Sequence, residues 1–203
     1  MTWVLFAVLV LVVLLALYLV ALYNGLVQKR NRVDNAWAQI EVQLRRRRDL
    51  IPNLVETVKG YAAHERGTFE AVTQARAAAA SAQSPAAIGA AEGMLSQALG
   101  RLFAVAEAYP ELKANQSFLD LQEQLRDTED KIAVSRQVYN DTVLTFNNAI
   151  QVFPAVVVAG MLGFSKREFF EIEDAGDREP PAVSFQATPS EPAADAPSDA
   201  PGS

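Results

Sequence analysis

The sequence predicts an all-α protein: an antiparallel four-helix bundle that follows a single N-terminal transmembrane helix. Three observations lead to this prediction: a long uncharged apolar stretch at the N-terminus, apolar residues that recur every three or four positions afterwards, and prolines that interrupt this pattern. The chain has 203 residues, enough for one domain of ordinary size with accessory segments. We expect an anchor at residues 1–23, a helical domain at residues 24–172 and a tail at residues 173–203.

The anchor is predicted from Thr2 to Tyr23, a stretch of 22 residues without a charge. A helix of this length covers roughly 33 Å, which is enough to cross a bilayer core. Trp3 at one end and Tyr23 at the other are typical of residues at the two membrane interfaces. A cleaved signal peptide is the alternative, but no basic residue precedes the stretch and LVALYNG is a poor cleavage site. The pattern therefore favours an uncleaved anchor.

The charges beside this stretch predict its orientation. No lysine or arginine precedes it, and Lys29, Arg30 and Arg32 follow it. Positive residues remain on the cytoplasmic side of a membrane, so we expect the N-terminus outside and the helical domain in the cytoplasm.

Four helices are expected after the anchor, at residues 24–48, 52–82, 86–108 and 116–152. The first should end near Arg48, because Pro52 lacks an amide hydrogen and disfavours helical geometry in the residue before it, and Asp49 is a suitable N-cap for the second. Ser84-Pro85 and Pro110 mark the next two boundaries. The apolar stripes are Val33, Trp37, Ile40 and Leu44; Leu54, Val58, Tyr61, Ala62, Phe69 and Val72; Ile88, Ala91, Leu95, Ala98, Leu102, Val105 and Tyr109; and Phe118, Leu121, Leu125, Thr128, Ile132, Ser135, Tyr139, Val143, Phe146 and Ile150.

Two segments follow the fourth helix. The apolar segment at residues 155–164 is too short to span a bilayer, so it either packs on the core as a short helix or dips into the membrane interface. Residues 173–203 hold seven acids, one base and six of the ten prolines, a composition that predicts a disordered acidic tail.

Three segments resemble the sequence signatures of the bacterial LemA family. They are NRVDNAWAQIEVQLRRRRDLIPNLVETVKGYAAHE (Asn31 to Glu65), AYPELKANQSFLDLQEQLRDTEDKIAVSRQVYNDTVLTFNNAIQVFP (Ala108 to Pro154) and GFSKREFF (Gly163 to Phe170). The resemblance implies an N-terminal anchor in the bacterial inner (plasma) membrane and a helical bundle without established catalytic activity. Asp130 and Phe146 depart from it, since the family pattern leads us to expect asparagine and tyrosine there.

Residues typical of catalytic or metal sites are scarce. There is no cysteine, and the single histidine, His64, lacks the second ligand of an HExxH or Glu-x-x-His pattern. We therefore expect no enzyme activity, no metal and no cofactor, although an all-carboxylate site from Glu41, Glu56, Glu65 and Glu129 stays open. Residues 24–172 carry 17 basic and 17 acidic residues, so general nucleic-acid binding is not expected.

Four asparagines suggest a polar seam between the first and last helices. Asn31 and Asn35 share one helix face, and Asn140 and Asn147 share another. If these pairs face each other near the membrane, their amides would hydrogen-bond and set the register of the two helices.

The run of four arginines is the strongest candidate for a partner-binding surface. Arg45 lies 22 residues beyond Tyr23, roughly 33 Å along a straight helix, which exceeds the Debye length of about 8–10 Å and so excludes attraction to lipid charge. If the chain turns at Pro52, the run meets the loop after the third helix at one distal tip. The predicted patch comprises Arg45, Arg46, Arg47, Arg48, Asp49, Pro52, Asn53, Tyr109, Glu111 and Lys113.

The sequence thus favours a membrane-anchored adaptor or scaffold that presents a polar tip to an unidentified protein partner. Two alternatives stay open: a regulatory subunit of a membrane hydrolase, and a protein that organises membranes by homo-oligomerisation through the alanine-rich residues 71–82 and the apolar segment.

Overall fold

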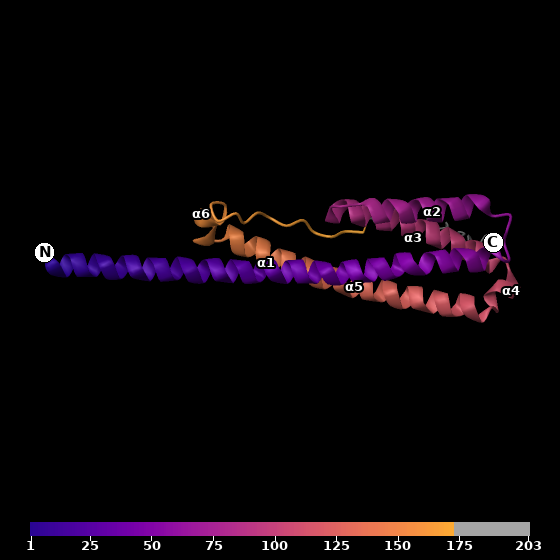
Figure 1. Cartoon of the computed structure of the whole chain (residues 1–203), viewed down its shortest axis with the longest axis horizontal. Coiled ribbons are helices and arrows are strands. Elements are labelled where there is room, and N and C mark those ends of the chain that lie inside the picture. The colour runs from indigo at the N-terminus through magenta and orange to yellow at the C-terminus, as the bar shows by residue number, and fades with distance from the viewer. Residues whose placement is uncertain (173–203) are drawn as a thin grey trace, which may run out of the picture. The chain divides into compact units, whose positions relative to one another are not determined.

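The computed structural model describes residues 1–172, so the predicted tail lies outside the described residues. Every element among residues 1–172 is a helix, which confirms the all-α prediction (Figure 1). The helices are α1 (Thr2–Lys59), α2 (Arg66–Ser81), α3 (Pro85–Glu107), α4 (Pro110–Lys113), α5 (Gln116–Gln151) and α6 (Ala155–Ala159).

Helix α1 is a single helix of 58 residues that joins the predicted anchor to the helical domain. Residues 1–21 are exposed throughout, and Leu26 is the first fully buried residue. The most apolar 18-residue window of α1 has a mean hydropathy of 3.3, and no other part of the described chain covers it. Among the described residues, α1 is the one helix long and apolar enough to cross a membrane.

The predicted turn at Asp49 to Asn53 is wrong, because α1 continues through Pro52 to Lys59. A proline inside a helix leaves the carbonyl four residues earlier without its amide donor, and here that carbonyl belongs to Arg48. The Arg76 side chain on α2 supplies the missing donor, with its Nε 2.8 Å from the Arg48 oxygen. In return, Nη1 of Arg48 donates to the Ala79 carbonyl on α2 at 2.7 Å. These contacts stabilise the helix across Pro52 and attach α2 to it.

The chain turns instead after Lys59, at Gly60, where the helix ends. Glycine is a poor helix former because it loses the most backbone freedom on ordering. The second helix accordingly begins at Arg66, and the residues expected at its start belong to α1.

Capping side chains define two later helix starts. The Ser84 side chain accepts a hydrogen bond from the Ala87 amide, and Pro85 occupies the first turn of α3. The Asn115 side chain accepts from the Phe118 amide and begins α5. Helix α5 then runs antiparallel to α1, back toward the anchor (Figure 1).

The apolar core has two parts, which we call the distal and proximal clusters. In the distal cluster, Ile51 to Val58 of α1 pack with buried residues of α2, α3, α4 and the first half of α5. In the proximal cluster, Leu26 to Leu44 of α1 pack with the second half of α5, with α6, and with Phe164 and Phe170 beyond it. Helices α2 and α3 pair with each other, and Ile88 is the one residue of this pair in the proximal cluster. A uniform four-helix bundle along the whole domain stays a prediction.

The hydrogen bond between Arg76 and the Arg48 carbonyl can be tested by a double-mutant cycle. Replacing Arg76 with methionine strands a carbonyl within α1, and the free energy of unfolding should fall by about 1–3 kcal/mol. Pro52→Ala restores an amide donor for that carbonyl. The loss caused by Arg76→Met should therefore be several-fold smaller in the Pro52→Ala background. Denaturant unfolding of the full chain in detergent micelles measures all four variants.

Arg101→Met on the exposed side of α3 is the matched control, with an expected change within about 0.5 kcal/mol. An Arg76→Met loss of the same size with Pro52 and with Pro52→Ala would contradict the proposed coupling.

Candidate interaction sites

The four consecutive arginines point in different directions, because successive residues of a helix are about 100° apart. Arg45 and Arg46 are exposed, and Arg46 pairs with Asp127 at 3.9 Å. Arg47 is buried, and Arg48 is half-buried against α2. The prediction that all four form one exposed patch is therefore wrong.

Arg47 lies at the centre of a buried polar cluster that links α1, α3 and α5. Its Nη1 donates to Oε2 of Glu92 at 2.8 Å, and its Nη2 donates to the Ser96 hydroxyl at 2.8 Å. Its Nε lies 2.7 Å from a carboxylate oxygen of Glu129 on α5. The side chains of Arg47 and Glu92 are almost completely buried, so they are not available to a partner. We infer that their pairing positions α3 against α1.

Burial raises the pKa of the Glu92 carboxyl from its ordinary value of 4.5. The charges of Arg47 and Arg48 oppose this rise, while Glu129 adds to it. A carboxyl that holds its proton more tightly in the folded state lowers the stability of the fold as pH rises above 4.5. The ion pair therefore offsets part of the desolvation free energy that burial of the Glu92 carboxylate costs.

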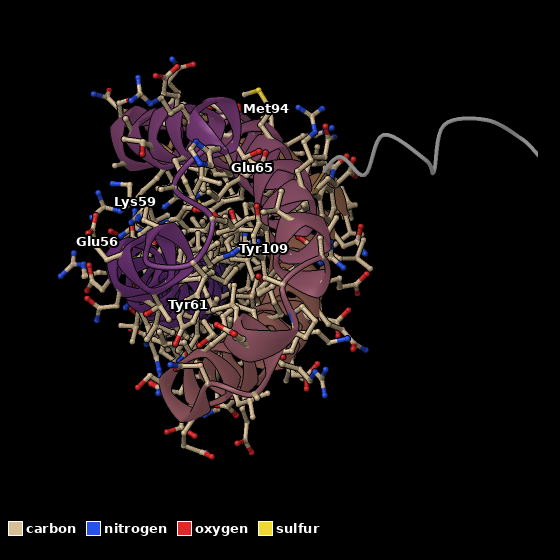
Figure 2. The ribbon with its side chains drawn as sticks, turned by 90° about the vertical axis from the view of Figure 1, so that its right-hand side faces the viewer. Glu56, Lys59, Tyr61, Glu65, Met94 and Tyr109 are labelled. Atoms are coloured by element: carbon tan, nitrogen blue, oxygen red, sulfur yellow. The ribbon has the colours of Figure 1, made fainter. Side chains whose placement is uncertain are left out.

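The distal end of the domain consists of residues 56–65 and 109–115, which the two turns bring together. The Asn115 amide donates to the Tyr61 hydroxyl at 3.0 Å and joins the turns. Figure 2 views this end and labels Glu56, Lys59, Tyr61, Glu65 and Tyr109. Of the predicted tip, Tyr109, Glu111 and Lys113 belong here.

The rest of the predicted tip lies elsewhere on α1. Arg45 is 14 residues before Lys59, roughly 21 Å from the distal end, and Asp49, Pro52 and Asn53 are exposed along the side of the helix. Residues 56–65 also belong to this end, although the sequence pattern places them inside the second helix; Gly60 is the signal for the turn.

A hollow of about 400 Å³ opens beside the distal end, between the last turn of α1 and α2. Lys59 lies over the Phe69 ring, with its Nζ 5.9 Å from the ring centroid, and pairs with Glu56 at 2.9 Å. The lining residues are Lys59, Arg66, Phe69, Glu70, Thr73 and Gln74. The hollow thus combines cationic, acidic and polar groups with one aromatic ring.

The predicted seam between asparagine pairs is wrong. Asn31 and Asn35 are exposed, whereas Asn140 and Asn147 hydrogen-bond to an extended segment after α6. We call this segment, residues 163–172, the C-terminal strap. It carries the predicted GFSKREFF motif and ends in the half-buried Ile172.

Each of the two asparagine side chains forms two hydrogen bonds to one strap residue, one with its backbone carbonyl and one with its backbone amide. Asn147 donates to the Arg167 carbonyl at 2.9 Å and accepts from the Arg167 amide at 2.8 Å. Asn140 does the same with Phe170, at 3.1 and 2.9 Å. Seven helical residues cover about 10.5 Å and three extended residues about 10 Å, so the spacings of the two elements match.

Aromatic contacts hold the side chains of the strap. The Phe170 ring lies 5.6 Å from Trp37, and the Phe164 ring lies 5.7 Å from Tyr23 and 6.3 Å from Phe146. The Tyr139 hydroxyl donates to the Glu168 carbonyl at 2.8 Å. Phe146, where the family pattern predicts tyrosine, thus contributes a ring contact.

Within residues 1–172, no group of three or more histidine, cysteine, aspartate or glutamate side chains could hold a metal ion. The lone His64 is exposed in the turn before α2.

Comparison with known proteins gives a family match and several relatives. The sequence profile of the LemA family matches residues 36–185. The magnetosome protein MamQ of Magnetospirillum gryphiswaldense is 28% identical over 181 residues, which covers 76% of this chain and 66% of MamQ. Protein LemA of Metamycoplasma hominis is 26% identical over 155 residues, which covers 74% of this chain and 69% of that protein. This chain thus spans just under two thirds of the length of the magnetosome relative.

The buried ion pair should show strong coupling. Replacing Arg47 with methionine leaves the Glu92 carboxylate buried without its main partner, and the free energy of unfolding should fall by about 3–5 kcal/mol. Adding Glu92→Met should recover most of this loss, as measured by denaturant unfolding. Because losing the cation raises the pKa of Glu92 further, the Arg47→Met penalty should be larger at about pH 8 than at about pH 5. A penalty that does not change with pH would contradict this account.

Two glycines of α3 provide a matched test of the strap. A Cβ at Gly89 would collide with the Glu171 carbonyl, whereas a Cβ at Gly100 meets nothing within 4 Å. Gly100→Ala should raise the free energy of unfolding by about 0.5–1 kcal/mol. Gly89→Ala should displace the strap and lower hydrogen-exchange protection of the Arg167 and Phe170 amides several-fold. Equal protection in the two variants would show that the strap does not depend on this close approach.

Proposed function

The chain belongs to the LemA family, and we propose that it is a non-enzymatic, membrane-anchored adaptor or scaffold whose distal end binds a cytoplasmic protein. The observation that carries this proposal is the continuity of α1 from the apolar anchor to the distal end. A single helix transmits the position and direction of its anchor to whatever its far end binds.

The length of α1 gives the proposed adaptor a defined reach. From Tyr23 to Lys59 the helix advances 36 residues, roughly 54 Å. The paired helix α5 and the distal cluster support it along this distance, so the distal end would stay at a constant height above the bilayer.

The chemistry of the distal end supports protein binding. Tyr61 and Tyr109 lie at this end together with the charged Lys59 and Glu65 (Figure 2), and Glu111 and Lys113 follow Tyr109 in the chain. Tyrosine is enriched at protein interfaces, since its ring covers apolar surface while its hydroxyl stays hydrogen-bonded. The adjoining hollow with Phe69 offers a pocket for an anchor residue of the partner.

Lys29, Arg30 and Arg32 support the cytoplasmic orientation, because they follow the anchor on the side of the helical domain. The MamQ relatives are named as magnetosome proteins. The membrane attachment proposed for this chain rests on its own helix α1.

Self-association is a second candidate function. Val134, Val138 and Leu144 are large apolar residues exposed on α5, and they offer a surface to another copy of the chain.

Photo-crosslinking in intact cells distinguishes the two candidates. A benzophenone side chain at His64 or at Glu111 should capture the same protein from either position. Lys59→Glu combined with Lys113→Glu should lower the yield about tenfold, a loss of about 1.4 kcal/mol in binding. The same double variant should lower the free energy of unfolding by only about 1 kcal/mol, because both lysines are exposed and Lys59 loses its surface contacts with Glu56 and Phe69.

The crosslinker at Val134 on α5 is the control position. Crosslinks to a second copy from Val134 alone would favour self-association over the adaptor. A captured partner that resides on the extracytoplasmic side of the plasma membrane would contradict the proposed orientation.

A further inference from the structure

The turn around α6 exposes an unusual concentration of apolar side chains. Residues 152–164 carry no charge. Ala155 and Ala159 face the proximal cluster and are buried, while their larger neighbours face outward. Phe153 is 82% exposed and Met161 is 88% exposed. The exposed set is Val152, Phe153, Val156, Val157, Met161 and Leu162.

The position of this turn along α1 identifies what covers it. Phe164, at the end of the turn, packs against Tyr23, the last residue of the predicted membrane stretch. Leu22 and Leu26 contact the same cluster, while residues 1–21 of α1 are uncovered. Figure 1 shows α6 beside α1 where the uncovered part of the helix ends. The exposed side chains of the turn therefore lie at the level where α1 leaves the bilayer.

The charges nearby have the arrangement expected of a headgroup layer. Lys29 and Arg32 follow Tyr23 by six and nine residues, roughly 9 and 14 Å along the helix. They line a hollow of about 220 Å³ between α1 and α5 that also contains Thr142, Thr145 and the acidic Asp141. The apolar turn thus lies on the membrane side of a basic belt, as in amphipathic segments that bind anionic membranes.

We propose that residues 152–163 form a membrane wedge, which inserts its apolar side chains into the interface of the bilayer that α1 crosses. The segment is too short to cross the bilayer, so it lies in the interface. Removing these apolar side chains from water favours their insertion. The wedge gives the chain a second attachment, which fixes the tilt of α1 and holds the start of the strap at the membrane surface.

This proposal requires that α1 spans the membrane, but it does not depend on the orientation of the chain or on any partner. Lipid is the proposed occupant of this apolar surface. A second copy of the chain is the competing occupant, and the experiment distinguishes contact with lipid from contact with this second copy.

The chain lacks cysteine, so single cysteines can carry a fluorescent probe without other changes. Val157 in the wedge and Val134 on α5 form a matched pair, because both are valines with 64% of their surface exposed. Each variant of the full chain, labelled with an environment-sensitive dye, is reconstituted into lipid nanodiscs at one copy per disc. Brominated lipids then report contact with the bilayer by quenching.

The Val157→Cys probe should be quenched several-fold more strongly than the Val134→Cys probe, most strongly by bromine near the headgroups. A Leu11→Cys probe in the middle of the anchor should be quenched most by bromine deep in the bilayer. Quenching at Leu11 with none at Val157 would overturn the wedge and leave the anchor intact. Absence of quenching at Leu11 would remove the anchor, and the proposed function with it. A third outcome would identify a second copy of the chain as the occupant. In that case the Val157 probe shows water-like emission in single-copy discs and apolar emission only when two copies share a disc.

Discussion

The path of α1 beyond Pro52 depends on one hydrogen bond at the carbonyl of Arg48. Pro52 removes the amide that would normally bond to this carbonyl, and a helix interrupted in this way kinks or ends. Arg76 provides a donor from α2 at 2.8 Å, and α1 continues for seven residues beyond the proline. The turn to α2 therefore occurs at Gly60 and not at Asp49. The position of the distal end, and thus the surface of the proposed adaptor, follows from this contact between two helices.

The buried pair of Arg47 and Glu92 plays a different part, because it sets where α3 lies along α1. An ion pair away from water contributes little net stability, but a misplaced α3 would leave the Glu92 carboxylate buried without Arg47, its main partner. Two adjacent arginines thus have separate structural roles: Arg47 positions α3, and Arg48 holds the end of α2. Only Arg45 and Arg46 stay available at the surface, which explains why a run of basic residues does not form a basic patch.

Much of the fold could be predicted from the sequence, because apolar periodicity reflects burial directly. Val33, Ile40 and Leu44 of the first stripe, and Ile88, Leu95 and Leu102 of the third, are buried as their spacing predicts. The path through Pro52 could not be predicted, since the donor that stabilises it lies in another helix. The role of Asn140 and Asn147 was equally hidden, because both bind backbone groups, which leave no trace in the sequence of the strap.

The two clusters of the core explain why the two ends of the domain differ. In the distal cluster four long helices surround the apolar residues, so this end is complete in water and can present polar groups. In the proximal cluster α1 and α5 have no second helix pair beside them, and the strap and α6 cover their apolar face instead. The apolar side chains that α6 turns outward stay exposed, and in the proposed wedge the bilayer shields them. The membrane then completes the proximal end of the core, as α2 and α3 complete the distal end.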